Sequence, residues 1–201
     1  GDVPVDIFHL KAGGRDNWPK TAQAILKIDS ARAGGVDVQA NMYPYVAGST
    51  GLTSCFPPSA SANGRLFRNL ADVEGRARIR AEIENQTENW ENLCALATPG
   101  GVLLLGFDNA ENRKMYSGRY LDDVAREFGK DWIETAMDLV LDERQRIGTV
   151  FFMMSEDNVR LQIKQPWMKF GTDAGGVDPR TTTALIHPRS YGTYARILGR
   201  Y

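Results

Sequence analysis

The residue types best suited to catalysis follow two apolar stretches near opposite ends of the chain. His9 and Lys11 come after VDIF. Asp173 comes after WMKFGT and before an alanine and two glycines. An imidazole binds a metal through one ring nitrogen, and a carboxylate binds a metal or takes a proton from water. Each residue also has a structural explanation, because a lone histidine is more often a hydrogen-bonded core residue and an aspartate after a strand often caps a turn.

Three further side chains could hold a ligand with a negative charge. Lys11 can bind a carboxylate or a phosphate, and Arg189 can bind a carboxylate through two parallel hydrogen bonds. Tyr43 follows an apolar stretch and carries a hydroxyl that can reach a ligand. An exposed lysine, a surface arginine and a core-edge tyrosine are the plainer alternatives. A catalytic zinc takes about three protein ligands, and beyond the histidine and the aspartate the sequence offers only His187 as a speculative third.

Composition and motifs exclude several classes of protein. The 201 residues carry a net charge of −1, which gives no electrostatic reason to expect nucleic acid or an anionic membrane as partner. No stretch approaches the ~20 apolar residues of a membrane helix, and HExxH, Walker and GxSxG motifs are missing. Cys55 and Cys94 lie in no metal-binding spacing, so we expect reduced thiols and a cytoplasmic protein.

The first third of the sequence predicts a strand, a helix and a second strand. The first strand ends near Phe8, a helix capped by Asn17 ends at Gly34, and the second strand covers 36–45 until Pro44 stops its pairing. A βαβ unit of this length predicts parallel strands with a right-handed crossover.

The rest of the chain predicts a loop followed by alternating helices and strands. In chain order we expect a loop over 47–64, a charged helix from Asp72 to about Glu91, a strand over 101–107, a helix through Val124 and Phe128, a helix over 131–142, a strand over 149–154, a helix near 158–165 capped by Ser155, a strand over 167–173 and a last helix after Pro188 or Ser190.

Strands whose carboxyl ends carry His9, Tyr43 and Asp173 predict a parallel α/β fold, in which active sites gather at that edge. We expect part of a TIM-type (β/α)8 barrel with a lid-like insertion, and the family resemblance described below implies that this barrel is a metal-dependent hydrolase. The expected segments are a barrel βαβ segment over 1–50, an insertion over 51–115 and later barrel βα units over 116–201. A barrel takes ~250 residues, so we expect a fragment whose bare strand edges favour self-association or pairing with the remainder of the barrel. The resemblance described below implies that the fragment is internal.

Five stretches, in this order, resemble the N-acyl-D-amino-acid deacylases (D-aminoacylases) of the amidohydrolase superfamily. They are IFHLKAGGRDNWPK, NMYPYVAGSTGL, FFMMSEDNV, FGTDAGG and HPRSYGTYARILGRY. The order and spacing of the blocks make the resemblance specific. It implies a zinc-dependent (β/α)8 enzyme with a small β-rich domain and a mobile insertion, which hydrolyses N-acylated D-amino acids.

The resemblance also implies roles for individual residues. His9 matches a zinc-binding histidine, and Asp173 matches an aspartate that contacts the more weakly held metal and serves as general base and then acid. The positions that hold the substrate's α-carboxylate or line its pocket match Lys11, Tyr43, Ser49 and Arg189. The implied cofactor is zinc, as one or two ions. We expect this chain alone to bind it poorly. The implied partner is a small-molecule substrate with a free carboxylate.

Some elements of the family pattern are absent or changed. A His-x-His pair, a cysteine ligand and another histidine are expected upstream of Gly1, and further helices and a small domain beyond Tyr201. Asn41 stands where many relatives have aspartate. Two alternatives stay open: another amidohydrolase, such as a dihydroorotase-like cyclic amide hydrolase, and a non-catalytic fragment or ligand-binding subdomain. We expect the isolated chain to be inactive.

Overall fold

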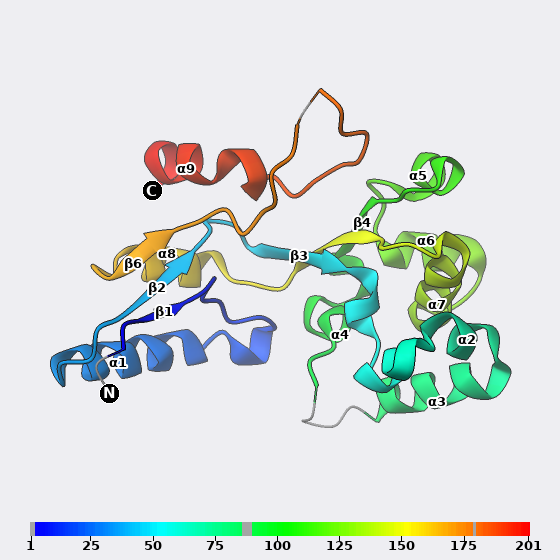
Figure 1. The fold of residues 1–201 in the computed structure, drawn as a ribbon, viewed down its shortest axis with the longest axis horizontal. Helices are drawn as coiled ribbons and strands as arrows, with labels where there is room; N and C mark the ends of the chain where they lie inside the picture. The colour runs from blue at the N-terminus through cyan, green and yellow to red at the C-terminus, as the bar shows by residue number, and fades with distance from the viewer. Residues whose placement is uncertain (1–2, 86–89, 179) are drawn as a thin grey trace. The chain divides into compact units, whose positions relative to one another are not determined.

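A computed structural model describes residues 3–85, 90–178 and 180–201 of the chain (Figure 1). The chain forms two compact units, and each is described by itself. The first unit consists of Gly1–Gly48, Met153–Thr182 and His187–Tyr201, and the second of Ser49–Phe152 and Thr183–Ile186. Helices and sheets both occur, which confirms the expected mixed α/β class.

The first unit is built on a parallel sheet with the strand order β1-β2-β6. Its strands are β1 (Val5–Ile7), β2 (Val38–Met42) and β6 (Met168–Phe170), and its helices are α1 (Lys20–Ala33), α8 (Glu156–Ile163) and α9 (Arg189–Arg200). Ala40 lies opposite Ile7 on one side and Met168 on the other. The chain passes from β1 through α1 to β2, as the βαβ prediction requires.

The core of the first unit lies between the sheet and helices α1 and α8. Alternate residues of β2 point to this side, and the cluster is made of Ile25, Ile28, Val38, Ala40, Met42, Val159, Trp167 and Met168. Because side chains alternate along a strand, Gln39 and Asn41 point to the opposite, polar face. One face of the sheet therefore packs into the core, and the other face carries polar side chains.

The helix α1 begins later than the sequence predicts. Asn17 lies in a 3₁₀ turn over Arg15–Asn17 rather than at the N-cap, and its side-chain nitrogen donates to the carbonyl of Gly13 over 2.7 Å. Pro19 takes the N-cap position, and Gly34 ends the helix as expected. The prediction of Asn17 as the cap is wrong because its amide is used within the preceding loop.

The second unit combines a small sheet, in the order β3-β5-β4, with helices. Its strands are β3 (Ala47–Gly51, which starts at the unit boundary), β4 (Val102–Gly106) and β5 (Gly148–Phe152), and its helices are α2 (Leu66–Ala71), α3 (Val73–Glu84), α4 (Leu93–Ala97), α5 (Ala110–Tyr116), α6 (Leu121–Phe128) and α7 (Trp132–Glu143). Strands β4 and β5 are antiparallel, with Val102 opposite Phe151.

Several sequence predictions for this unit are confirmed, and others are wrong. The strand at 101–107 and the helices through Val124 and over 131–142 are present as β4, α6 and α7. The predicted loop over 47–64 instead contains β3 and two 3₁₀ helices. The predicted charged helix ends at Glu84, with Asp72 capping it by accepting from the amide of Gly75, and positions 86–89 lie outside the described residues.

The structure divides residues 116–201 between the two units. Residues 116–152 lie in the second unit with 51–115, and β5 pairs antiparallel to β4, whereas β6 pairs parallel to β2. The described residues show a parallel sheet but no closed barrel. The expected barrel segments therefore stay a prediction.

Cys55 and Cys94 form a disulfide, with their Cα atoms 5.0 Å apart. The prediction of reduced thiols is wrong, because the short helical turn over Leu52–Cys55 and α4 bring together two cysteines that lie 39 positions apart in the sequence. This pairing removes the cysteine argument for a reducing compartment. Within the described residues, no helix is both long enough and apolar enough to cross a membrane.

Candidate functional site

The carboxyl ends of β1, β2 and β6 bring most of the predicted site residues to one edge of the first unit. His9 follows β1 by two residues, Tyr43 follows β2 directly and Asp173 follows β6 by three. Because the strands are parallel and adjacent, these three ends lie at the same edge of the sheet. Arg189 reaches this edge from the first position of α9.

His9 is held by contacts to its backbone and its ring. The Nζ atom of Lys11 lies 2.7 Å from His9 Nδ1 and donates to the His9 carbonyl over 2.8 Å. The backbone N–H of His9 donates to Oδ1 of Asn41 over 2.7 Å. Within the described residues, the other ring nitrogen, Nε2, makes no hydrogen bond and is the atom that a metal could reach.

Asp173 is paired with Arg189. Its Oδ2 lies 2.8 Å from Arg189 Nη1, and the two side chains are 24% and 8% exposed. Asp173 and His9 also share a backbone property, since their φ angles are 47° and 42°. Residues with side chains rarely adopt this left-handed conformation, and such strained positions cluster at functional sites.

The ring of Tyr43 lies close to both cations. Lys11 Nζ lies 5.4 Å and Arg189 Cζ 4.6 Å from the ring centroid, distances at which the face of an aromatic ring attracts a cation. Burial raises the pKa of the Tyr43 phenol to about 12, and Arg189 opposes this shift. Burial lowers the pKa of Lys11 to about 8, which Asp173 opposes and Arg189 reinforces. Tyr43 is thus a neutral hydrogen-bonding group at neutral pH.

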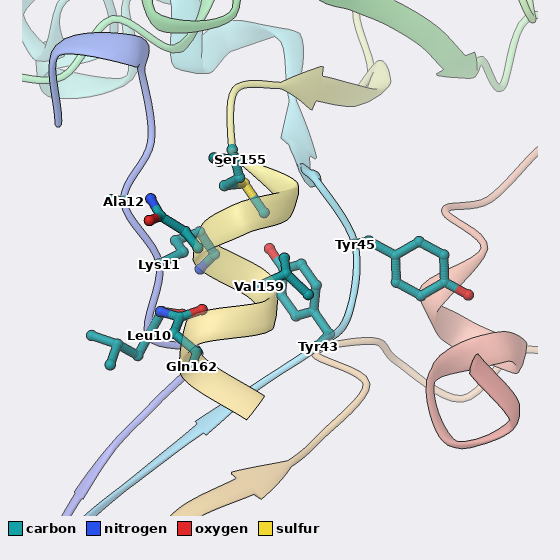
Figure 2. A pocket seen from close by; sticks show the side chains of 10 residues that line it. Leu10, Lys11, Ala12, Tyr43, Tyr45, Ser155, Val159 and Gln162 are labelled. Carbon is teal, nitrogen blue, oxygen red and sulfur yellow. The ribbon is translucent and has the colours of Figure 1, made fainter. Parts of the chain in front are cut away.

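A small pocket lies beside this cluster, between the end of β2 and helix α8 (Figure 2). Its lining includes Lys11, Tyr43 and Tyr45 together with Val159 and Gln162 of α8. Figure 2 shows Tyr43 turned toward α8 and Tyr45 turned away from it. A second, more open hollow on the polar face of the sheet is lined by Asp173 and Asn41, among others. The cluster is therefore accessible from the sheet edge.

His187 cannot serve as the third metal ligand. Its Nδ1 accepts a hydrogen bond from the Arg189 amide over 3.0 Å, so its Nε2 carries the proton and donates to the carbonyl of Ala47, 2.9 Å away. Burial lowers the pKa of the His187 imidazole to about 4. Both nitrogens are used, and the buried neutral ring positions the start of α9.

Ser49 lies in the other unit from the cluster. It belongs to β3, and its Oγ donates to the carbonyl of Thr149 over 3.0 Å. Its assignment to the substrate pocket stays a prediction.

The donor types present fit zinc, but their number does not make a complete site. His9 offers an imidazole and Asp173 a carboxylate, which are ordinary zinc ligands. Across the described residues, however, no group of three or more histidine, cysteine, aspartate or glutamate side chains could hold a metal. The chain therefore offers part of a ligand set.

Sequence reasoning missed the part played by Asn41. The sequence singled it out only as a departure from the aspartate of relatives, whereas in the structure its side chain holds the backbone of His9. No sequence signal could have revealed this bond, because it joins residues that lie 32 positions apart.

Comparisons with known proteins confirm the resemblance. The chain is homologous to N-acyl-D-amino-acid deacylases, a group within the amidohydrolases. A comparison with protein-family models gives no match.

Two relatives come from Alcaligenes xylosoxydans xylosoxydans. The D-aminoacylase is 31% identical over 200 residues, which are 100% of this chain and 30% of the relative. The N-acyl-D-glutamate deacylase is 27% identical over 195 residues, 97% of this chain and 29% of the relative. The chain thus spans about 30% of the length of the curated relatives it matches.

Solved structures give the same result. A D-aminoacylase described as defining a novel subset of amidohydrolases is 30% identical with a TM-score of 0.63, and it matches 100% of this chain and 31% of its own. A D-aminoacylase described by its binuclear metal centre is 29% identical with a TM-score of 0.64, over the same shares. The N-acyl-D-glutamate deacylase from Bordetella bronchiseptica, solved with zinc and a phosphonate inhibitor, covers 98% of this chain and 31% of its own, with a TM-score of 0.64. It shares 24% identity and supports the fold alone.

Proposed function

We propose that this chain supplies part of the active site of a metal-dependent amidohydrolase that removes the N-acyl group from N-acyl-D-amino acids. In this proposal β1, β2 and β6 are neighbouring strands of a TIM-type barrel. The observation that carries it is the placement of His9 and Asp173, both in the left-handed conformation, at one edge of the sheet, where each contacts a cation that lies near the buried ring of Tyr43.

His9, through Nε2, and Asp173 would each give one ligand to a zinc ion, and further ligands would come from polypeptide outside this sequence. A bound zinc polarises a carbonyl oxygen and lowers the pKa of a water molecule toward about 7. The binuclear metal centre named for the D-aminoacylase at 29% identity supports this assignment.

The carboxylate of Asp173 would accept the proton of the attacking water and deliver it to the leaving nitrogen. The water oxygen bonds to the acyl carbon, the C–N bond breaks, and the amine leaves with the transferred proton. Arg189 and Lys11 would hold the substrate's α-carboxylate, with the Tyr43 phenol as a neutral donor beside it. Since Arg189 now pairs with Asp173, a substrate carboxylate would replace that partner.

A second candidate is a non-catalytic, ligand-binding role for the isolated chain. The incomplete set of metal ligands among the described residues favours it. A cyclic amide substrate, as in a dihydroorotase-like hydrolase, is the remaining alternative, and it would need no clamp for a free α-amino-acid carboxylate.

The two histidines of the chain give a direct test. Zinc is added to the ¹⁵N-labelled chain, and the ring signals of His9 and His187 are followed by NMR. We expect zinc to shift the His9 signals and to leave the His187 signals in place, and we expect His9→Ala and Asp173→Ala to weaken the response. A His9 signal that ignores zinc would overturn the proposed metal site.

Hydrolysis is measured on the same preparation. We expect no turnover of N-acetyl-D-amino acids by the chain alone, and binding of these acids that is lost when their carboxylate is capped as an amide. Turnover with tightly bound zinc would show that the chain needs no further ligands. Preference for L-amino acid derivatives or for a cyclic amide would overturn the proposed substrate class.

A further inference from the structure

We propose that Asn41 is a positioning residue that fixes the turn after β1 and thereby aims the imidazole of His9. The metal-binding consequence rests on the proposed function. The positioning itself does not, and it can be tested on the metal-free chain.

Asn41 holds two consecutive backbone amides of this turn. Its side-chain Oδ1 accepts from the His9 N–H over 2.7 Å, and its backbone carbonyl accepts from the Leu10 N–H over 2.8 Å. The backbone bond continues the ladder between parallel strands and is open to any residue at position 41. The side-chain bond requires an acceptor at that position.

The conformation of His9 explains why such an acceptor is needed. A φ of 42° is unfavourable for a residue with a Cβ atom, so the surrounding structure must compensate for it. In that conformation the His9 amide donates a hydrogen bond to the side chain of Asn41, which stabilises it. Asn41 Nδ2 lies 3.4 Å from Oδ1 of Asp6, which orients the amide so that its oxygen faces His9.

The same turn sets the direction of the ring. Lys11 contacts both the carbonyl and the Nδ1 atom of His9, so ring and backbone are held as one unit. A turn that relaxes to another φ would carry the imidazole away from Lys11. Second-sphere residues that orient a metal ligand in this way contribute strongly to metal affinity.

The test compares Asn41→Ala, Asn41→Asp and Gln39→Ala in the metal-free, ¹⁵N-labelled chain at fixed pH. Asn41→Asp keeps the acceptor oxygen, and Gln39→Ala is the matched control on the same strand and face. We expect Asn41→Ala to shift the His9 ring signals toward those of an unrestrained histidine and to speed exchange of the His9 amide at least tenfold. Gln39→Ala should leave both near wild type. Asn41→Asp keeps the acceptor but sets a second carboxylate beside Asp6, so it should stay closer to wild type than Asn41→Ala.

The His187 ring reports separately on the fold of the unit. If Asn41→Ala moves the His187 signals too, the comparison passes to Asn41→Leu, which keeps the side-chain volume and removes the acceptor. The decisive variant is the one, Asn41→Ala or Asn41→Leu, whose His187 signals stay as in wild type. If its His9 signals are also unchanged, the proposal is overturned. With zinc added, the loss of the acceptor should weaken the His9 response about 10- to 100-fold. A chain in which zinc never shifts His9 contradicts the proposed function and leaves the metal-free result intact.

Discussion

The ammonium of Lys11 lies 2.7 Å from the Nδ1 atom of His9. A matching contact joins Arg189 to Asp173, and both cations lie near the Tyr43 ring. Each candidate metal ligand is thus paired with a candidate carboxylate-binding cation. Under the proposed function, a metal that takes Asp173 would release Arg189 for the substrate, whereas Lys11 keeps its contact with His9 Nδ1 because the metal uses Nε2. Binding of metal and of carboxylate should therefore be coupled through Arg189.

The pair formed by Arg189 and Asp173 should stabilise the first unit. Arg189→Ala leaves the partly buried carboxylate of Asp173 without its cation. We expect the free energy of unfolding to fall by about 1–3 kcal/mol, which is less than for a fully buried pair because Asp173 is partly exposed. Asp173→Asn should cost less, because the amide oxygen still accepts a hydrogen bond. Chemical denaturation of both single variants and the double variant gives the coupling energy. Additive losses would show that the pair contributes nothing.

The same arginine should select ligands with a free carboxylate. We expect Arg189→Ala to weaken binding of an N-acetyl-D-amino acid about tenfold or more, because charge-assisted hydrogen bonds to the carboxylate are lost. Binding of the amide-capped analogue should change little. Ligand titrations followed by NMR measure both. Equal losses on the two ligands would contradict a carboxylate clamp and indicate a general disturbance of the pocket.

His187 should make the first unit less stable in mild acid. Its pKa is about 4 in the folded chain, against an ordinary value of 6.5, because burial disfavours the charged ring. The unfolded chain therefore binds the proton first as the pH falls below 6.5. Stability should decrease from pH 6.5 toward pH 4 and show no contribution from this group above 6.5, with a limit of about 3 kcal/mol.

Denaturation at several pH values between 6.5 and 5 measures this slope. His187→Gln keeps a hydrogen-bonding side chain without a titrating ring and should flatten the slope in that range. The carboxylates contribute mostly at lower pH. An unchanged slope in the variant would assign the effect to other groups.

The sequence predicts the elements whose pattern is local. The spacing of Ile25 and Ile28 predicts the buried face of α1, and the alternation of helix and strand predicts the parallel pairing of β1 with β2. The family resemblance identifies His9 and Asp173 as candidate site residues. The parallel strands predict that both lie at one edge of the sheet. These features depend on periodicity or on block order, and both are visible in a sequence.

Other features depend on contacts between distant segments. The bond from Asn41 to His9 and the antiparallel pairing of β4 with β5 leave no mark in local composition. The use of both His187 nitrogens depends on the carbonyl of Ala47, 140 positions away. Tertiary pairing of this kind also explains why the glycine-rich stretch at 47–51 forms a strand although its residues favour a loop.

The Cys55–Cys94 disulfide should stabilise the second unit. The bond closes a loop across 39 positions, and restricting such a loop in the unfolded chain stabilises the folded state by about 2–4 kcal/mol. Both sulfur-bearing side chains are fully buried, so reduction by dithiothreitol should be slow until the unit opens. Thermal unfolding with and without the reductant should show a lower Tm for the reduced chain, and Cys55→Ala/Cys94→Ala should match the reduced protein and ignore the reductant. A Tm that is the same in all three preparations would mean that packing around α4 alone holds this segment, and that the bond adds no stability.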